Sequence, residues 1–122
     1  MRLMTDFENN ELQTLLDLDG LVFWPNAKYW VKFNAKRVTP TDQIPHGVRY
    51  SLTLHDKNNT RILGFDNAHS IKAKKRSKFT GRIVEWDHIH KFEHATHYEF
   101  RSPTQLLTDF WKAVDQIIGE KD

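Results

Sequence analysis

The chain has 122 residues, 39% of them hydrophobic, which is enough for one domain with its own apolar core. It contains no cysteine, and this excludes disulfide bonds and zinc sites with thiolate ligands. No apolar run is long enough to span a membrane, and the acidic N-terminal stretch lacks the apolar core of a secretion signal. We therefore expect a single cytoplasmic domain over residues 1–122.

The formal net charge is only +2, but the charges are unevenly distributed. Acidic residues gather near both ends of the chain, whereas every charged residue between Ile71 and Val84 is basic. Such a basic stretch allows a polyanionic partner without requiring one. The basic residues of this stretch are Lys72, Lys74, Lys75, Arg76, Lys78 and Arg82.

In the N-terminal half, Thr5–Leu18 spaces its leucines among acidic residues in the manner of a short helix, which Asp19-Gly20 should end. Apolar and polar residues then alternate with a period of two, which predicts strands. In the first of these runs Trp30 falls on the same face as the polar residues Lys32 and Asn34. The predicted strands are Lys28–Val38, Val48–His55 and Arg61–Phe65, with a turn at Asp56-Lys57-Asn58-Asn59 between the last two.

In the C-terminal half, Arg82–Trp86 resumes strand character, and Tyr98–Phe100 is a last short strand or extended piece. A helix should follow, because Ser102 is a good N-cap, Pro103 fits the first helical position and Gln105 completes a capping box. Its apolar residues recur at helical spacing, with Gly119 as the expected stop. They are Leu106, Leu107, Phe110, Trp111, Val114, Ile117 and Ile118.

Together these elements predict an α+β domain. It should contain a small antiparallel sheet of about four or five strands, a C-terminal amphipathic helix packed on one face of that sheet, and a short N-terminal helix.

All seven histidines lie between His46 and His97, and several stand beside aspartates. Two polar groups stand out, Asp66-Asn67-Ala68-His69 and Asp87-His88-Ile89-His90. Imidazole has an unperturbed pKa of about 6.5, so it can exchange protons or bind metal ions near neutral pH. These two groups are the candidate functional site.

Each group also has a structural interpretation. If the strand from Arg82 continues, His88 and His90 share one face and could converge on a metal ion or a phosphate, whereas Asp87 faces the other way. Alternatively, they are a solvated strand end with local hydrogen bonds. Asp66 could face the histidines and orient an imidazole, or its group could simply form a capping turn. The sequence leaves both pairs of alternatives open.

The basic stretch is equally open to two interpretations: a solvated loop, or a loop that binds a phosphate backbone beside the Asp/His groups. Trp24, Trp30 and Trp86 could stack bases, but tryptophans of so small a domain more often belong to the core. We assign Trp111 to the core as part of the helical stripe.

Several segments taken together resemble the TumE-type toxin family, over roughly Val48–Gly119. Ser70 follows His69 where members more often carry a second histidine. The segments are Arg49-Tyr50-Ser51-Leu52, Arg61-Ile62-Leu63-Gly64-Phe65-Asp66-Asn67-Ala68-His69, Asp87-His88-Ile89-His90-Lys91, Tyr98-Glu99-Phe100 and Gln105-Leu106-Leu107-Thr108-Asp109-Phe110-Trp111-Lys112-Ala113-Val114-Asp115.

The resemblance implies a growth-inhibiting toxin of a toxin–antitoxin pair, with a helix-turn-helix antitoxin as partner and RNA as the commonest target. We hypothesise a ribonuclease in which His88 and His90 are acid and base without a metal ion. Its candidate catalytic residues are Asp66, His69, Asp87, His88 and His90, and the basic stretch would bind the RNA strand.

Two alternatives accompany this hypothesis. In a variant, Asp66, His69, His88 and His90 bind a divalent metal ion, although no cofactor is favoured. In the second, the protein is a non-catalytic binding module whose histidines are structural or sense metal or pH. The sequence leaves a homodimer open.

Overall fold

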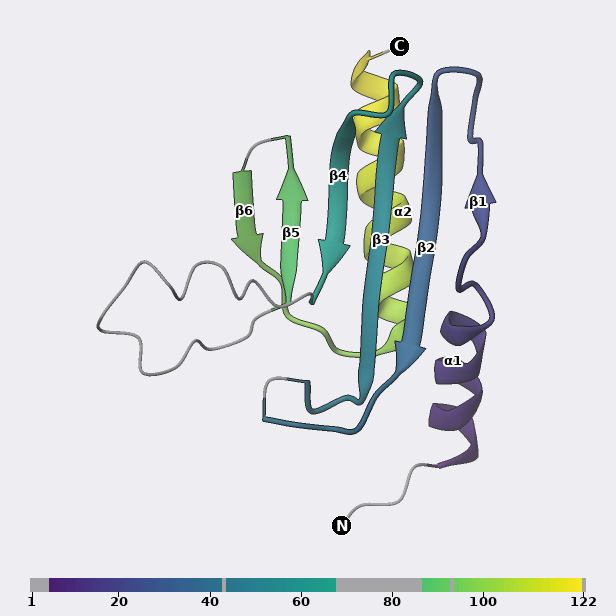
Figure 1. Ribbon diagram of the computed structural model, residues 1–122, viewed down its shortest axis with the longest axis vertical. Coiled ribbons are helices and arrows are strands. Elements are labelled where there is room, and N and C mark those ends of the chain that lie inside the picture. The colour runs from purple at the N-terminus through teal and green to yellow at the C-terminus, as the bar shows by residue number, and fades with distance from the viewer. Residues whose placement is uncertain (1–4, 43, 68–86, 93, 122) are drawn as a thin grey trace, which may run out of the picture.

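A computed structural model describes residues 5–42, 44–67, 87–92 and 94–121 of the protein, with side chains up to residue 119. It confirms the predicted α+β class (Figure 1). In chain order the elements are α1 (Asp6–Leu16), β1 (Val22–Phe23), β2 (Tyr29–Arg37), β3 (Val48–Asp56), β4 (Arg61–Asp66), β5 (His88–Lys91), β6 (His94–His97) and α2 (Pro103–Lys121).

The strands form one antiparallel sheet in which each strand pairs with its neighbours in the sequence, from β1 at one edge to β6 at the other. Its six strands exceed the predicted four or five, because β1 and β6 are short and show no clear alternation. Tyr98–Phe100 is not a strand, and the last strand is His94–His97 instead. The predicted strand Arg82–Trp86 lies outside the described residues.

Helix α2 lies across one face of the sheet, as predicted, and buries its apolar stripe there (Figure 1). Phe110 is fully buried and makes edge-on ring contacts with Phe33 of β2 and Phe65 of β4. The inward side chains of β2 and β3 alternate with exposed or half-buried ones, except at the buried Thr53, which explains the period of two in the sequence. Leu107 and Trp111 lie at the margin of this core rather than inside it.

The predicted start of α2 is confirmed, but its predicted end is wrong. The Ser102 hydroxyl accepts a hydrogen bond from the Gln105 backbone N–H at 3.0 Å. The Gln105 side chain donates to Asp109 instead of returning to Ser102, so the capping box is only half formed. The helix continues through Gly119 to Lys121, since a glycine near a helix end weakens the helix without obliging it to stop.

Helix α1 is shorter than predicted and begins with a complete capping box. Thr5 and Glu8 each bond the other's backbone N–H, which satisfies two donors that the first helical turn leaves open. Leu12 and Leu15 are buried in the shared core. The turn after the helix contains Gly20 at a φ of 84°, as the sequence led us to expect. Neither described helix is long and apolar enough to cross a membrane.

The sheet face opposite α2 is covered by no described helix, and we call it the open face. Outward side chains of β2 to β5 lie on it, among them Trp30, Ser51, Asp66 and His88.

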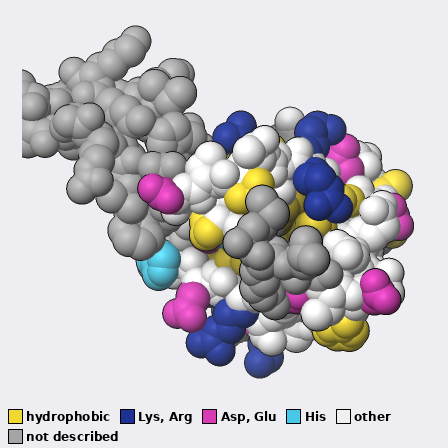
Figure 2. Space-filling model, turned by 90° about the horizontal axis from the view of Figure 1, so that it is seen from below, with side chains coloured by type: hydrophobic (Ala, Val, Ile, Leu, Met, Phe, Trp, Pro, Cys, Tyr) yellow, Lys and Arg dark blue, Asp and Glu magenta, His cyan; other side chains and the backbone are white. Residues whose placement is uncertain are grey.

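At the lower end of the molecule, the visible Lys and Arg side chains lie in separate groups with Asp and Glu side chains near them (Figure 2). Among the described residues, that end presents no single basic surface.

Phe110→Ala should lower the free energy of unfolding by about 3–5 kcal/mol, because it removes a buried ring that contacts two strands and leaves a cavity. A chemical denaturation curve measures this. Gln116→Ala, at an exposed position of the same helix, should change stability by less than about 0.5 kcal/mol. Equal effects of the two substitutions would contradict the packing of α2 on the sheet.

Candidate functional site

The candidate site forms where β4 pairs with β5. Asp66 is directly opposite His88, and Gly64 is directly opposite His90. Residues opposite one another in an antiparallel pair project to the same face, so all three polar side chains lie on the open face. Because Gly64 has no side chain, nothing from its position stands between Asp66 and His90.

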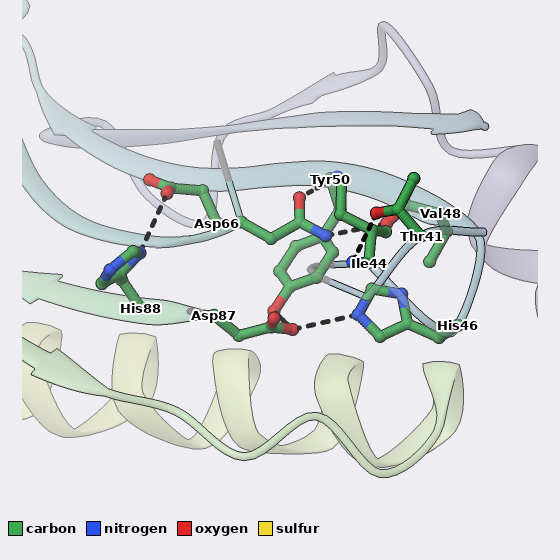
Figure 3. A network of polar contacts seen from close by, with 9 residues as sticks. Thr41, Ile44, His46, Val48, Tyr50, Asp66, Asp87 and His88 are labelled. Atoms are coloured by element: carbon green, nitrogen blue, oxygen red, sulfur yellow. Dashed lines mark hydrogen bonds and ion pairs between the residues drawn. The ribbon is translucent and has the colours of Figure 1, made fainter. Parts of the chain in front are cut away.

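The Asp66 carboxylate lies between the two imidazoles. Its Oδ1 is 4.0 Å from Nδ1 of His88, and its Oδ2 is 3.4 Å from Nε2 of His90. The rings of His88 and His90 are 5.6 Å apart between centroids. Figure 3 shows Asp66 and His88 pointing toward one another from adjacent strands. We call these residues the Asp66–His88–His90 cluster.

The cluster is accessible on one side and supported on the other. About 30% of the His88 side chain and 26% of the His90 side chain are exposed, against 10% for Asp66. A hollow of about 370 Å³ adjoins the cluster and is lined by His88, Ala95, Thr96 and His97. His97 stands directly opposite His88 on β6. A substrate group can therefore reach the imidazoles, while the carboxylate is fixed beneath them.

Such an arrangement suits two kinds of chemistry. A carboxylate beside imidazoles stabilises a protonated ring and can fix the position of its protons, as general acid–base catalysis requires. It can also bind a divalent metal ion, since one ligand atom from each of the three residues lies within 4.8 Å of the others. Two imidazoles and one carboxylate form a ligand set typical of zinc and other transition metals.

Asp87 belongs to a different, buried group on the inner face of the sheet. Its Oδ2 accepts a hydrogen bond of 2.8 Å from the Tyr50 hydroxyl and lies 3.3 Å from Nε2 of His46 (Figure 3). The His46 ring packs against Phe100 with centroids 4.0 Å apart. Burial, followed by the charge and hydrogen bond of Asp87, raises the pKa of Tyr50 far above its ordinary value. The phenol therefore remains a donor to this carboxylate.

Asn67 fixes the end of β4 next to the cluster. Its side-chain carbonyl accepts a hydrogen bond from the Tyr50 backbone N–H at 2.9 Å, and its amide donates to the Val48 carbonyl at 2.8 Å. The residue is 1% exposed. Its side chain thus extends the pairing of β4 with β3 beyond the last strand residue. This bond pattern helps to hold the preceding Asp66 in place, whereas the rest of the predicted capping turn lies outside the described residues.

The structure brings together three of the five proposed catalytic residues, Asp66, His88 and His90. Asp87 is separated from them by the sheet, as the strand alternation predicted. His69 lies outside the described residues, as do Trp86 and the basic residues Lys72, Lys74, Lys75, Arg76, Lys78 and Arg82.

The sequence did not reveal the two partners of Asp87, which are His46 and Tyr50. Tyr50 occupies an inward position of a well-predicted strand, so only its hydroxyl hinted at a buried polar partner. His46 follows Pro45 in a loop, and nothing in the neighbouring sequence marks it as a partner of Asp87. Their contact with Asp87 depends on the packing of segments that are distant in the sequence.

The chain is similar to a known protein family. A family model described as Toxin TumE matches residues 26–118, which is most of the chain. No curated protein and no solved structure shows a significant similarity to this chain. The matched region includes the whole Asp66–His88–His90 cluster and the buried contacts of Asp87.

Tyr50→Phe should destabilise the protein by about 1–3 kcal/mol, because it removes a donor from the buried Asp87 carboxylate. Thermal or chemical denaturation measures the change. Tyr29→Phe is the matched control, since Tyr29 is also a core tyrosine but makes no side-chain hydrogen bond within the described residues. If the two variants unfold alike, the Tyr50–Asp87 hydrogen bond does not support the fold.

Proposed function

Because the chain belongs to the TumE toxin family, we propose that it inhibits growth by cleaving RNA at the Asp66–His88–His90 cluster. Membership in this family makes the protein the toxin of a toxin–antitoxin pair, with an antitoxin as its partner. That RNA is the target, and that the antitoxin is a helix-turn-helix protein, are parts of the proposal.

The single observation that carries the proposal is the placement of one carboxylate between two partly exposed imidazoles. Metal-independent RNA cleavage needs a base for the ribose hydroxyl and an acid for the leaving oxygen, and two imidazoles can fill both roles near neutral pH. The separations of 3.4 and 4.0 Å exceed those of good hydrogen bonds, as is common for catalytic groups without substrate.

In the proposed reaction, one imidazole removes the proton of a ribose 2′-hydroxyl, and the resulting oxygen attacks the adjacent phosphorus. The bond from phosphorus to the 5′-oxygen breaks, and the other imidazole, which is protonated, donates its proton to that oxygen. The products are a 2′,3′-cyclic phosphate and a 5′-hydroxyl end. Asp66 lies beside both rings and stabilises whichever one carries the positive charge.

A metal-dependent reaction at the same residues is the second candidate, favoured by the ligand atoms lying within 4.8 Å of one another. Tetrahedral ligands with bonds of about 2.1 Å lie about 3.4 Å apart, so the side chains would close by about 1 Å around an ion. The ion would then supply a Lewis acid or an activated water. We favour the metal-independent reaction because the cluster already provides both proton-transfer groups.

Expression of this protein without its antitoxin should slow bacterial growth, and His88→Ala or His90→Ala should relieve the inhibition. Each substitution removes a group that typically contributes on the order of 10² to 10⁴ in rate. Growth curves after induction measure the effect, and melting temperatures show that the variants still fold.

His94→Ala is the matched control, because His94 is an exposed histidine of the same hairpin that pairs with Lys91 and faces away from the cluster. It should leave the protein as toxic as the parent. If all three variants behave alike, toxicity does not depend on the cluster, and a non-catalytic binding module becomes the better interpretation.

The purified protein should cleave RNA to fragments with 2′,3′-cyclic phosphate and 5′-hydroxyl ends in the presence of EDTA. Mass spectrometry of the products identifies the ends. Cleavage that EDTA abolishes and that Zn²⁺ or Mn²⁺ restores would instead assign the cluster to the metal-dependent reaction. A parent that leaves RNA intact under both conditions would exclude both mechanisms.

A further inference from the structure

Two tryptophans expected in the core lie instead on the open face. Trp24 directly follows β1 and is 57% exposed, and its ring lies 6.4 Å from that of Trp30. Trp30 alternates with inward residues of β2 and therefore points outward. The ring of Trp24 is so exposed that it contributes little to the core. Its large apolar surface is therefore available to a partner.

His55 holds Trp30 in position. Its imidazole stacks on the indole with centroids 4.1 Å apart and an interplanar angle of 10°. The His55 ring is itself oriented by a 2.9 Å contact between Nε2 and the Thr53 hydroxyl. Burial, and then the charge of Arg61, lowers the pKa of His55 and so favours the neutral ring. Trp24, Trp30 and His55 form an ordered aromatic surface, the aromatic platform.

The open face carries several exposed cations, some beside the platform and some toward the Asp66–His88–His90 cluster. Lys32 is two residues from Trp30 on β2, and the exposed Arg49 lies toward the other end of β3. Arg49 is opposite Lys36, whose ammonium group is paired with Asp19 at 2.8 Å. The Arg61 side chain lies on the same face, since its Nη1 is 3.6 Å from the place where a Gly64 side chain would begin. Asp66 is the only acid at the outward positions of β2, β3 and β4, all of which are described in full. These cations are suited to a partner that carries repeated negative charges.

The platform and the Asp66–His88–His90 cluster share this face at a defined separation. Asn34, Ser51, Asp66 and His88 stand opposite one another on consecutive strands, and Trp30 is four residues before Asn34 on β2. Strand geometry puts Trp30 about 13 Å from Asn34 along β2, and Asn34 about 10 Å from Asp66 across two strands. The distance from Trp30 to Asp66 is therefore roughly 16 Å. An extended single strand covers this distance in a few nucleotides.

We propose that single-stranded RNA binds across the open face, with an unpaired base stacked on Trp24 and Trp30 and a phosphate at the Asp66–His88–His90 cluster. This inference rests on the proposed function and names its substrate class. Sheet faces bind single strands by stacking bases on aromatic side chains while cations hold the backbone. Bases paired within a duplex do not offer their faces to such a platform, so double-stranded RNA should bind less tightly.

The test measures binding without cleavage. A labelled 2′-O-methyl oligouridine lacks the attacking hydroxyl, and an abasic oligomer of equal length keeps the phosphates but has no bases. Trp24→Leu should weaken binding of the oligouridine on the order of tenfold and leave binding of the abasic oligomer unchanged. Trp24→Phe should retain most of the affinity, because a smaller aromatic ring still stacks.

Two controls separate stacking from charge and from damage to the fold. Phe7→Leu removes an aromatic ring that is 70% exposed on α1, and it should leave both affinities unchanged. Lys32→Gln should weaken the binding of both oligomers equally. It should also reduce the slope of log affinity against log salt concentration by about one released counterion.

The stacking proposal would be overturned if Trp24→Leu lost the same affinity for both oligomers, or lost affinity for neither. Equally tight binding of duplex RNA to the parent would also overturn it. If Trp24→Leu behaves as expected while the histidine variants remain toxic, RNA binding stands and the proposed chemistry fails. If toxicity depends on the histidines while Trp24→Leu binds normally, the chemistry stands and the platform does not bind bases.

Discussion

The pairing of β4 with β5 is the contact on which both polar groups of this protein depend. Asp66 and Asn67 end one side of this pairing, and Asp87 and His88 begin the other. Because neighbouring side chains of a strand point to opposite faces, each pair sends one residue outward and one inward. The outward residues contribute to the Asp66–His88–His90 cluster, and the other two both bond Tyr50 of β3, Asn67 at its backbone N–H and Asp87 at its hydroxyl.

Because the two groups lie on opposite faces of the sheet, the residues proposed to react are not the residues whose buried contacts stabilise the fold. The three members of the cluster are supported from beneath by a fully packed core, in which Phe110 contacts β2 and β4 together. Asp87 and Asn67 satisfy their polar groups with buried partners and leave the cluster accessible on the other face. Under the proposed function, the open face then provides the reacting groups, cations and a stacking surface on one continuous sheet.

Strand periodicity predicted much of this arrangement from the sequence. On the condition that the strand continued, it placed His88 and His90 on one face and Asp87 on the other. It also put Trp30 on the same face as Lys32, a face that proves to point outward. The composition of a small domain nevertheless favoured a core role for the tryptophans, and the local period proved the better guide. The short edge strands were missed because two or four residues carry too little periodicity. The contacts of Asp87 needed tertiary packing, which no local pattern encodes.

Asn67 and Asp87 stand beside each other at one end of the β4–β5 pairing, and hydrogen bonds fix both residues. Because Asn67 bonds the Tyr50 backbone N–H and Asp87 bonds the Tyr50 hydroxyl, one residue of β3 anchors both sides of the β4–β5 pairing at this end. A buried tyrosine on the inner face of the sheet therefore helps to set the spacing of Asp66 and His88 on the open face.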